Sequence, residues 1–393
     1  VVYALTTGTP IRVVTGGIPP LKGASVAEKM EDMRRNHDWL RTCIMQQPRG
    51  FLSLVGAILT EPCSPEADYG VFYIDALTYQ PMCGAGTLSV AKALVETGMV
   101  KRVEPETKIV LETPTGLVTV YVKWENHTVA SINLENVPAF LYRKDLHIDL
   151  AGYGDVSVDI GYGGNFFVLA DVHSLGLTIT KDTVNLLRSL SKDILAAANK
   201  VIKVAHPTNP AINYLDQVLF CQNVPEEDGG YLAQCIFGDA QADISPCGTG
   251  TSTRLAQRYF RGLIGLEETF VQKSVCGGFH AKGLRETTLG GVPAIVPYVS
   301  CSDVHITGFN HLIVEENDKL KNGFVLTADS ACVDPANYDK RTGERICLEH
   351  IANKLWELEG YRLQLPEEIR ELPVQRFNVF LLIPVGSFNG CHT

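Results

Sequence analysis

The chain has 393 residues, of which 45% are hydrophobic and 20% are charged, and its formal net charge is −10. This composition predicts a globular protein with a large buried core. It disfavours nucleic acid and anionic membranes as partners, because phosphate binding needs positive charge gathered on one face. Small molecules are therefore the expected partners. No apolar run approaches the roughly 20 residues that span a bilayer, and no charged region precedes an apolar one at the N-terminus, so a cytoplasmic location is expected.

The eleven cysteines are scattered singly, and no two are spaced as Cys-x-x-Cys. This spacing disfavours a zinc ribbon or a redox motif, and a chain of this length does not need disulfides to stabilise its core. No paired-ligand spacing for a metal occurs either. We therefore predict no metal site and expect most cysteines to be reduced, buried and structural.

The first half of the chain reads as strand-rich with two helices. A capping box, Ser25 with Glu28, and apolar residues near helical spacing predict one amphipathic helix that ends before Pro48. The second helix is expected after Cys83. Apolar runs bounded by turn residues predict strands at residues 51–59, 69–77, 108–113, 117–124 and 131–137.

The second half repeats this mixture. The predicted elements are strands near residues 156–171, a long helix over 180–202, and strands at 217–223, 229–239 and 290–299. A glycine-rich stretch, AGYGDVSVDIGYGGN, favours a domain boundary. We predict domains over residues 1–157 and 158–330, and a C-terminal extension over 331–393 that packs on one of them and contains a helix and a closing strand.

The motif Cys-Gly-x-Gly-Thr occurs twice, beginning at Cys83 and at Cys247. In both copies an amphipathic helical pattern follows, and a glycine stands fifteen residues after the cysteine, at Gly98 and at Gly262. These glycines are well placed to end the two helices. The repeat indicates that the two halves are duplicated units.

A cysteine and glycines at the start of a helix predict a particular chemistry. The glycines let backbone N–H groups approach a ligand, and the helix N-terminus adds partial positive charge, which favours a carboxylate. The same charge is expected to lower the pKa of the thiol from about 8.5 toward 7 or below. Two such elements predict a site between the domains, where one thiolate removes an α-proton and the opposite thiol protonates the other face.

Other readings of these residues fit less well. A tyrosine-phosphatase loop needs five residues between Cys and Arg, whereas six separate Cys247 from Arg254. Neither glycine set completes G-x-G-x-x-G, and no P-loop motif occurs. A cysteine hydrolase needs a histidine near its nucleophile. The histidines are spread singly, and His206 is expected to be structural.

The two cysteine elements, together with TTGTPIRVV, QPRG, YGGNFFVLAD and VHITGFNHL, make the chain resemble the proline racemase family. This family includes hydroxyproline 2-epimerases and trans-3-hydroxyproline dehydratases and has the diaminopimelate-epimerase fold. The resemblance covers residues 5–330. It implies an α/β (α+β) fold of two pseudo-symmetric domains, each a strand-rich sheet or barrel around a central helix, with the active site between them. It also implies a homodimer that uses neither pyridoxal phosphate nor a metal.

The resemblance also implies roles for individual residues. It places the catalytic pair at Cys83 and Cys247, and it makes Asp243 the acid that meets the amino group of the substrate. The backbone that binds the substrate carboxylate then corresponds to Gly84, Ala85, Gly86, Gly248, Thr249 and Gly250.

Two positions depart from the family pattern. Ala85 stands where the family usually has His, and Thr9 stands where Glu is expected. Loss of an imidazole beside the substrate nitrogen removes a polar contact and leaves space. Our hypothesis is a substrate range shifted away from plain proline, toward a larger or substituted amino acid.

The expected function is cofactor-independent racemisation or epimerisation of proline, hydroxyproline or a related amino acid. One alternative is a trans-3-hydroxyproline dehydratase of the same family, although such dehydratases carry Thr where this chain has Cys247. Another is a non-catalytic amino-acid-binding protein on the same fold, which Ala85 leaves open.

Overall fold

The computed structural model describes residues 1–238 and 240–323, and the predicted C-terminal extension, with its helix and strand, lies outside them. The described residues form a mixed α/β fold in which strands predominate, as the sequence predicts. None of the described helices is both long and apolar enough to cross a bilayer. The predicted homodimer and cytoplasmic location stay predictions.

The first half of the chain supplies a run of strands with three helices between them. These elements are β1 (Val2–Thr6), β2 (Thr9–Val14), α1 (Val26–Asn36), α2 (Asp38–Met45), β3 (Val55–Thr60), β4 (Tyr69–Ile74), β5 (Tyr79–Gln80), α3 (Gly84–Glu96), β6 (Glu106–Thr113), β7 (Gly116–Glu125) and β8 (Thr128–Glu135). Along the sheet, β1 is antiparallel to β2, β2 parallel to β3, β3 antiparallel to β4, and β4 parallel to β6. Antiparallel β6, β7 and β8 complete the run.

The second half contains corresponding elements. They are β9 (Phe140–Leu150), β10 (Gly154–Tyr162), β11 (Phe166–Asp171), η1 (His173–Leu175), α4 (Val184–Val201), β12 (Gln217–Cys221), β13 (Tyr231–Phe237), β14 (Gln241–Ala242), α5 (Gly248–Phe260), β15 (Phe270–Ser274), β16 (Gly277–Leu289), β17 (Val292–Cys301) and β18 (Val304–Phe309). From β10 to β17 the pairings repeat those of the first half in type and order. The fold is therefore pseudo-symmetric.

The two halves are joined within one hydrogen-bonded sheet. β8 of the first half pairs with β17 of the second. The last strand of the chain, β18, follows β17 but pairs with β1 of the first half, and β9, which follows β8, pairs with β10. The predicted boundary between residues 157 and 158 falls inside β10. The assignment of the chain to domains over 1–157 and 158–330 stays a prediction.

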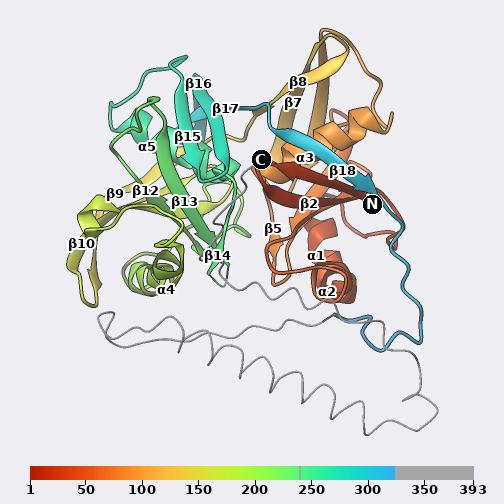
Figure 1. Ribbon diagram of the computed structural model, residues 1–393, viewed down its shortest axis with the longest axis horizontal. Coiled ribbons are helices and arrows are strands. Elements are labelled where there is room, and N and C mark those ends of the chain that lie inside the picture. Colours follow the sequence, from red (N-terminus) through yellow and green to blue (C-terminus); the bar gives the residue numbers. More distant parts are fainter. Residues whose placement is uncertain (239, 324–393) are drawn as a thin grey trace, which may run out of the picture. The chain divides into compact units, whose positions relative to one another are not determined.

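Helices occupy the connections between parallel strands, which need long crossovers. α1 and α2 connect β2 to β3, and α4 connects β11 to β12 (Figure 1). The crossovers from β4 to β6 and from β13 to β15 contain α3 and α5. Both are central helices, because each contacts strands from several parts of the sheet: α3 contacts β1, β2, β3, β7, β8 and β18, and α5 contacts β9, β10, β11, β16 and β17.

The predicted single helix after Ser25 is two helices, α1 and α2. The capping prediction is confirmed, because the Ser25 Oγ accepts the Glu28 N–H at 3.2 Å. The continuous helix is wrong, because His37 leaves helical geometry, with φ −137° and ψ 21°. Asp38 then starts α2, and its carboxylate accepts hydrogen bonds from Arg41 and from the Tyr79 hydroxyl on β5. A tertiary contact that no helical pattern encodes thus marks the new start.

The predicted ends of α3 and α5 are confirmed. Gly98 and Gly262 both have a φ of +71°, in the left-handed region that glycine adopts without strain. In both helices the N–H of this glycine donates back into the last turn, from Gly98 to the Val95 carbonyl and from Gly262 to the Tyr259 carbonyl. The two helices therefore end in the same way as well as starting with the same motif.

The N-termini of α3 and α5 meet at two glycines. A Cβ atom on Gly84 would lie 2.6 Å from the Gly248 Cα, and one on Gly248 would lie 2.7 Å from the Gly84 Cα. These atoms belong to backbone, which cannot turn away as a flexible side chain does. Glycine is therefore required at both positions for the helices to approach so closely.

We expect Gly84→Ala to destabilise the folded chain by about 1 to 3 kcal/mol, because the added methyl group overpacks a backbone contact. The matched control is Gly16→Ala, since a Cβ at Gly16 has nothing within 4 Å and no left-handed backbone to strain. Urea unfolding of both variants and of the wild-type chain measures the effect. A Gly84→Ala midpoint equal to that of the control would contradict the contact.

Candidate active site

The two predicted cysteines begin the two central helices. Cys83 is the N-cap of α3, and its Sγ accepts the Gly86 N–H at 3.3 Å. Cys247 is the N-cap of α5, and its Sγ accepts the Gly250 N–H at 3.4 Å. Each sulfur takes the place that a serine or aspartate oxygen has in an ordinary N-cap. The prediction that both motifs start helices is confirmed.

The repeated threonines secure the first turns of these helices. The hydroxyls of Thr87 and Thr251 each donate to the carbonyl of the preceding cysteine in the motif, both at 2.7 Å. Each hydroxyl has a further partner on a neighbouring strand, the Tyr73 hydroxyl at 2.5 Å and the Gln272 amide at 3.0 Å respectively. The threonine of Cys-Gly-x-Gly-Thr therefore holds the cysteine backbone in place from behind.

One buried pocket lies at the meeting point of the two helices, with walls from both halves of the chain. Seven predicted residues line it: Cys83, Gly84, Ala85, Asp243, Cys247, Gly248 and Thr249. Gly86 and Gly250 do not line it, and their N–H groups donate to the two sulfurs. His206 lies elsewhere, among the rings of Phe140 and Tyr162, with its Nδ1 accepting backbone N–H groups.

Asn165 links the two cysteine segments through its side chain. Its side-chain amide donates to the Met82 carbonyl at 3.0 Å and lies 3.4 Å from the Thr249 hydroxyl. These partners come from opposite halves: Met82 directly precedes the first motif, and Thr249 belongs to the second. Sequence reasoning missed this role, although Asn165 belongs to the YGGN segment already quoted, because only the folded chain shows what its amide reaches.

Asp243 is held by three hydrogen bonds to one oxygen. Its Oδ1 accepts the Thr9 hydroxyl at 3.0 Å and both the N–H and the hydroxyl of Ser245 at 2.9 Å. Burial raises the pKa of this carboxyl, against the opposing effect of these donors. Thr9, which departs from the family pattern, thus positions the acid through its hydroxyl.

The expectation of a lowered thiol pKa is wrong for Cys83. Burial raises the pKa of the Cys83 thiol to about 12, and the nearby Asp243 and Cys247 add to the rise. The N–H groups of Gly86 and Ala85 oppose this effect but do not outweigh it. Helix N-termini favour a thiolate, but removing the anion from water costs more here.

The backbone at the two cysteines differs despite the repeated motif. Cys83 has an extended conformation with φ −143°, whereas Cys247 has φ +64°, in the left-handed region that side chains other than glycine seldom adopt. Two hydrogen bonds stabilise the backbone around Cys247: the Cys247 N–H donates to the Ser245 hydroxyl, and the Gln272 side-chain amide donates to the Pro246 carbonyl. Such strain is typical of functional sites.

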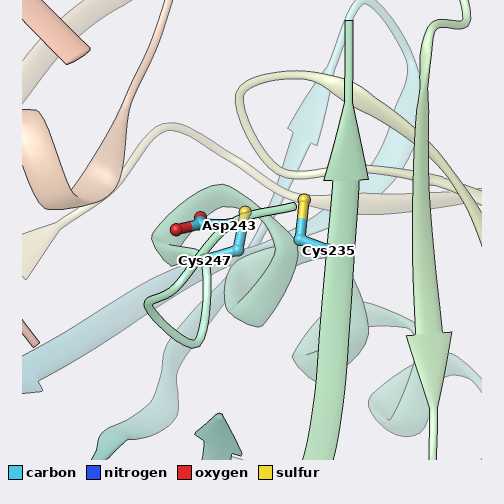
Figure 2. Close-up of side chains that lie close together, drawn as sticks. All are labelled: Cys235, Asp243 and Cys247. Atoms are coloured by element: carbon cyan, nitrogen blue, oxygen red, sulfur yellow. The ribbon is translucent and has the colours of Figure 1, made fainter. Parts of the chain in front are cut away.

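A third thiol, Cys235 on β13, lies in the same pocket. Figure 2 shows it on the strand beside Cys247 and Asp243, and the ligand atoms of the three residues all lie within 4.8 Å of one another. Sequence reasoning counted Cys235 among the structural cysteines. The feature in the sequence that could have indicated this role is Gly238, which lies between Cys235 and Asp243 and favours a hairpin. In the structure this hairpin pairs the two residues, and the Asp243 N–H donates to the Cys235 carbonyl.

Comparisons with known proteins agree with this geometry. The sequence profile of the family described as Proline racemase matches residues 1–325. A second profile, of a family described as Phage protein (N4 Gp49/phage Sf6 gene 66), matches residues 318–366. The racemase match therefore covers all of the described residues.

Individual relatives align along almost their whole length. A proline racemase of Clostridioides difficile is 39% identical over 322 residues, which are 82% of this chain and 96% of the relative. A trans-3-hydroxy-L-proline dehydratase of Burkholderia cenocepacia is 37% identical over 323 residues, with the same coverage. The crystal structure of a hydroxyproline epimerase from Agrobacterium vitis with bound trans-4-hydroxy-L-proline is 29% identical, with a TM-score of 0.78 over 83% of this chain and 94% of that one. The chain belongs to the proline racemase family.

Proposed function

We propose that the chain is a cofactor-independent racemase or epimerase that inverts the α-carbon of proline, hydroxyproline or a related amino acid. Cys83 and Cys247 act as its paired acid and base. One observation carries this proposal: two thiols, each at the N-terminus of a central helix, line one pocket where the two helices meet. The family relatives that act on proline and hydroxyproline support the same substrate class.

The proposed reaction exchanges one proton for another at the α-carbon. The thiolate of one cysteine takes the α-proton, the electron pair of the broken C–H bond moves toward the carboxylate, and the thiol of the other cysteine protonates the opposite face. After one turnover the two sulfurs have exchanged protonation states. The reverse reaction therefore uses the same pair with their roles reversed.

The two helix ends supply the stabilisation that this step needs. Negative charge develops on the carboxylate as the α-proton leaves, and N–H groups at a helix N-terminus together with the helix dipole favour that charge. In this scheme the carboxylate lies over Gly84 and Gly248, where the two N-termini meet. Two aligned helix ends thus act on one developing charge.

Charge in the pocket favours a substrate that carries an ammonium group. The side chains that line the described pocket include the Asp243 carboxyl but no lysine, arginine or histidine. A substrate ammonium beside Asp243 adds the missing positive charge and lowers the pKa of Cys83 from its raised value. In the proposed mechanism, the base therefore forms when the substrate binds.

Replacement of either catalytic cysteine is expected to abolish inversion. We expect Cys83→Ser and Cys247→Ser each to lower the rate by about 100-fold to 10,000-fold, because a serine hydroxyl is a far weaker base than a thiolate. Chiral chromatography with L-proline and trans-4-hydroxy-L-proline measures inversion, and NMR in deuterated water follows exchange of the α-proton.

The control is Cys63→Ser, a partly exposed cysteine that does not line the pocket. It is expected to retain the wild-type rate. Inversion by either catalytic-cysteine variant at the wild-type rate would refute the two-base scheme. Formation of a pyrroline from trans-3-hydroxy-L-proline, with no enantiomer from any substrate, would refute inversion and favour the dehydratase alternative.

The raised pKa of Cys83 predicts a pH dependence for its alkylation. Only the thiolate reacts with iodoacetamide, so in the free protein the rate at Cys83 should keep rising between about pH 8 and pH 11 without reaching a plateau. Peptide mapping by mass spectrometry assigns the label, and the Cys83→Ser variant confirms the assignment. A plateau near pH 7 would show that the helix N-terminus outweighs burial.

Ala85 predicts the range of substrates. It lies in the pocket wall with its carbonyl accepting the Thr6 hydroxyl, and its methyl group is much smaller than the imidazole that the family usually has at this position. We propose that amino acids larger than proline, or substituted prolines, are turned over with the higher kcat/KM. A panel of proline, the 4-hydroxyprolines and larger amino acids tests this, and a clear preference for proline would contradict it.

The variant Ala85→His tests the same residue directly. A ring at this position should lower kcat/KM for the larger substrates by more than about 10-fold relative to proline, because it occupies their space. Ala85→Ser is the matched control, since it adds a polar atom without a ring. An equal loss for large and small substrates in Ala85→His would assign the effect to general damage of the pocket.

A further inference from the structure

The two-thiol scheme leaves one pocket thiol without a role. Cys235 is almost completely buried at 1% exposure, yet its Sγ, the Cys247 Sγ and a carboxylate oxygen of Asp243 lie within 4.8 Å of one another (Figure 2). Among residues 1–238 and 240–323, no other group of three His, Cys, Asp or Glu side chains comes so close together. This cluster needs an explanation beyond proton transfer.

The fold holds the three side chains in place through backbone pairing. In the β13–β14 hairpin, Ile236 pairs with Ala242, and one step further the Asp243 N–H donates to the Cys235 carbonyl at 2.9 Å. Residues directly opposite each other in such a ladder point to the same face. Cys247 follows after a turn in which the Ser245 hydroxyl bonds to both Asp243 and the Cys247 N–H. The cluster is therefore held by the backbone pairing of the hairpin and by the hydrogen bonds of the Ser245 hydroxyl.

We propose that Cys235, Asp243 and Cys247 form a binding site for a thiophilic divalent cation such as Zn²⁺ or Cd²⁺. Two thiolates and one carboxylate are ligands that these ions prefer, and four-coordinate zinc accepts three protein ligands with the fourth position open. All three residues line the pocket, so an ion held by them would be accessible from it. A bound ion occupies the sulfur of Cys247 and blocks that side of the pocket.

Charge in the pocket supports a cation at this place. The described residues that line the pocket include Asp243 and the thiols of Cys83, Cys235 and Cys247, but no lysine, arginine or histidine that would offset negative charge on them. A divalent ion supplies that positive charge. It binds by displacing the protons of the two thiols, with no change of oxidation state.

This proposal goes beyond the proposed function and does not rest on it. A cation held by Cys235 and Cys247 would bind whether or not the chain turns over an amino acid. If the chain is a racemase, the same ion inhibits it, because a metal-bound sulfur cannot take or give the α-proton. Binding and inhibition can therefore be measured separately.

The experiment is a titration of the full, reduced and chelator-treated chain with Cd²⁺, followed by the ultraviolet charge-transfer absorption of cadmium thiolates. The wild-type chain is compared with Cys235→Ala and with the matched control Cys221→Ala. Cys221 is a buried thiol on the neighbouring strand β12 and belongs to the same apolar cluster, but it does not line the pocket. The comparison removes any signal from cysteines elsewhere in the chain.

We expect Cys235→Ala to lose one equivalent of bound Cd²⁺, or to bind it at least about 100-fold more weakly, because it loses a direct ligand. Cys221→Ala should bind as the wild type does. Equal titrations of the wild type and Cys235→Ala would overturn the site. Circular dichroism checks folding, and Cys235→Ser, which keeps the size of the side chain, replaces the alanine variant if that variant does not fold.

Inhibition gives a second, independent readout. Zn²⁺ should inhibit the wild type and Cys221→Ala, EDTA should reverse the inhibition, and Cys235→Ala should be at least about 10-fold less sensitive. Inhibition reversed by a thiol reductant but not by EDTA would assign the effect to thiol oxidation and overturn the metal site. Absence of turnover in all variants would refute the proposed function while the Cd²⁺ titration still decides the site.

Discussion

The close approach of two helix N-termini is the constraint on which the rest of the site depends. α3 and α5 meet at Gly84 and Gly248 with no room for a side chain between them. Two partly positive helix ends that face each other repel, and an anion or a thiolate between them relieves this repulsion. The contact brings the two N-cap thiols to one pocket, and in the proposed reaction the substrate carboxylate lies there between them. The strand pairings, which are repeated in both halves, position the two helices so that their N-termini meet.

Burial and helix ends act against each other at this place. The helix N-terminus favours a thiolate at Cys83, yet removal from water outweighs it, and the carboxyl of Asp243 adds to the rise in pKa. Among the described residues, no basic side chain lines the pocket, so the positive charge is left to be supplied by whatever binds. In the proposed reaction that charge is the substrate ammonium, and in the proposed metal site it is the cation. The two proposals share one electrostatic cause and compete for the same sulfur.

The pseudo-symmetry is broken where the chemistry is most specific. The second half alone holds the acid, its partner Thr9 reaches it from the first half, and the third thiol lies beside it. Cys247 also has a left-handed backbone where Cys83 is extended. The third residue of the motif also differs, being Ala85 in the first copy and Thr249 in the second, and both residues line the pocket. Equivalent helices thus have different surroundings, and in the proposed reaction these surroundings face the two sides of an asymmetric amino acid.

The sequence alone determined the parts of this protein that depend on local pattern. The repeated Cys-Gly-x-Gly-Thr predicted two helix starts with cysteines, the later glycines predicted the helix ends, and the apolar runs predicted most of the strands, because caps and periodicity act over a few residues. The family and fold class followed from the same motifs.

Only the tertiary structure decided what depends on residues distant in the chain. The break at His37 follows from the contact of Asp38 with β5, and the raised pKa of Cys83 follows from burial that no motif reports. Cys235 joins the site because a hairpin pairs it with Asp243. Local sequence specifies which groups are present and which turns they begin. Packing between segments far apart in the sequence determines how exposed those groups are to solvent and which other side chains they contact.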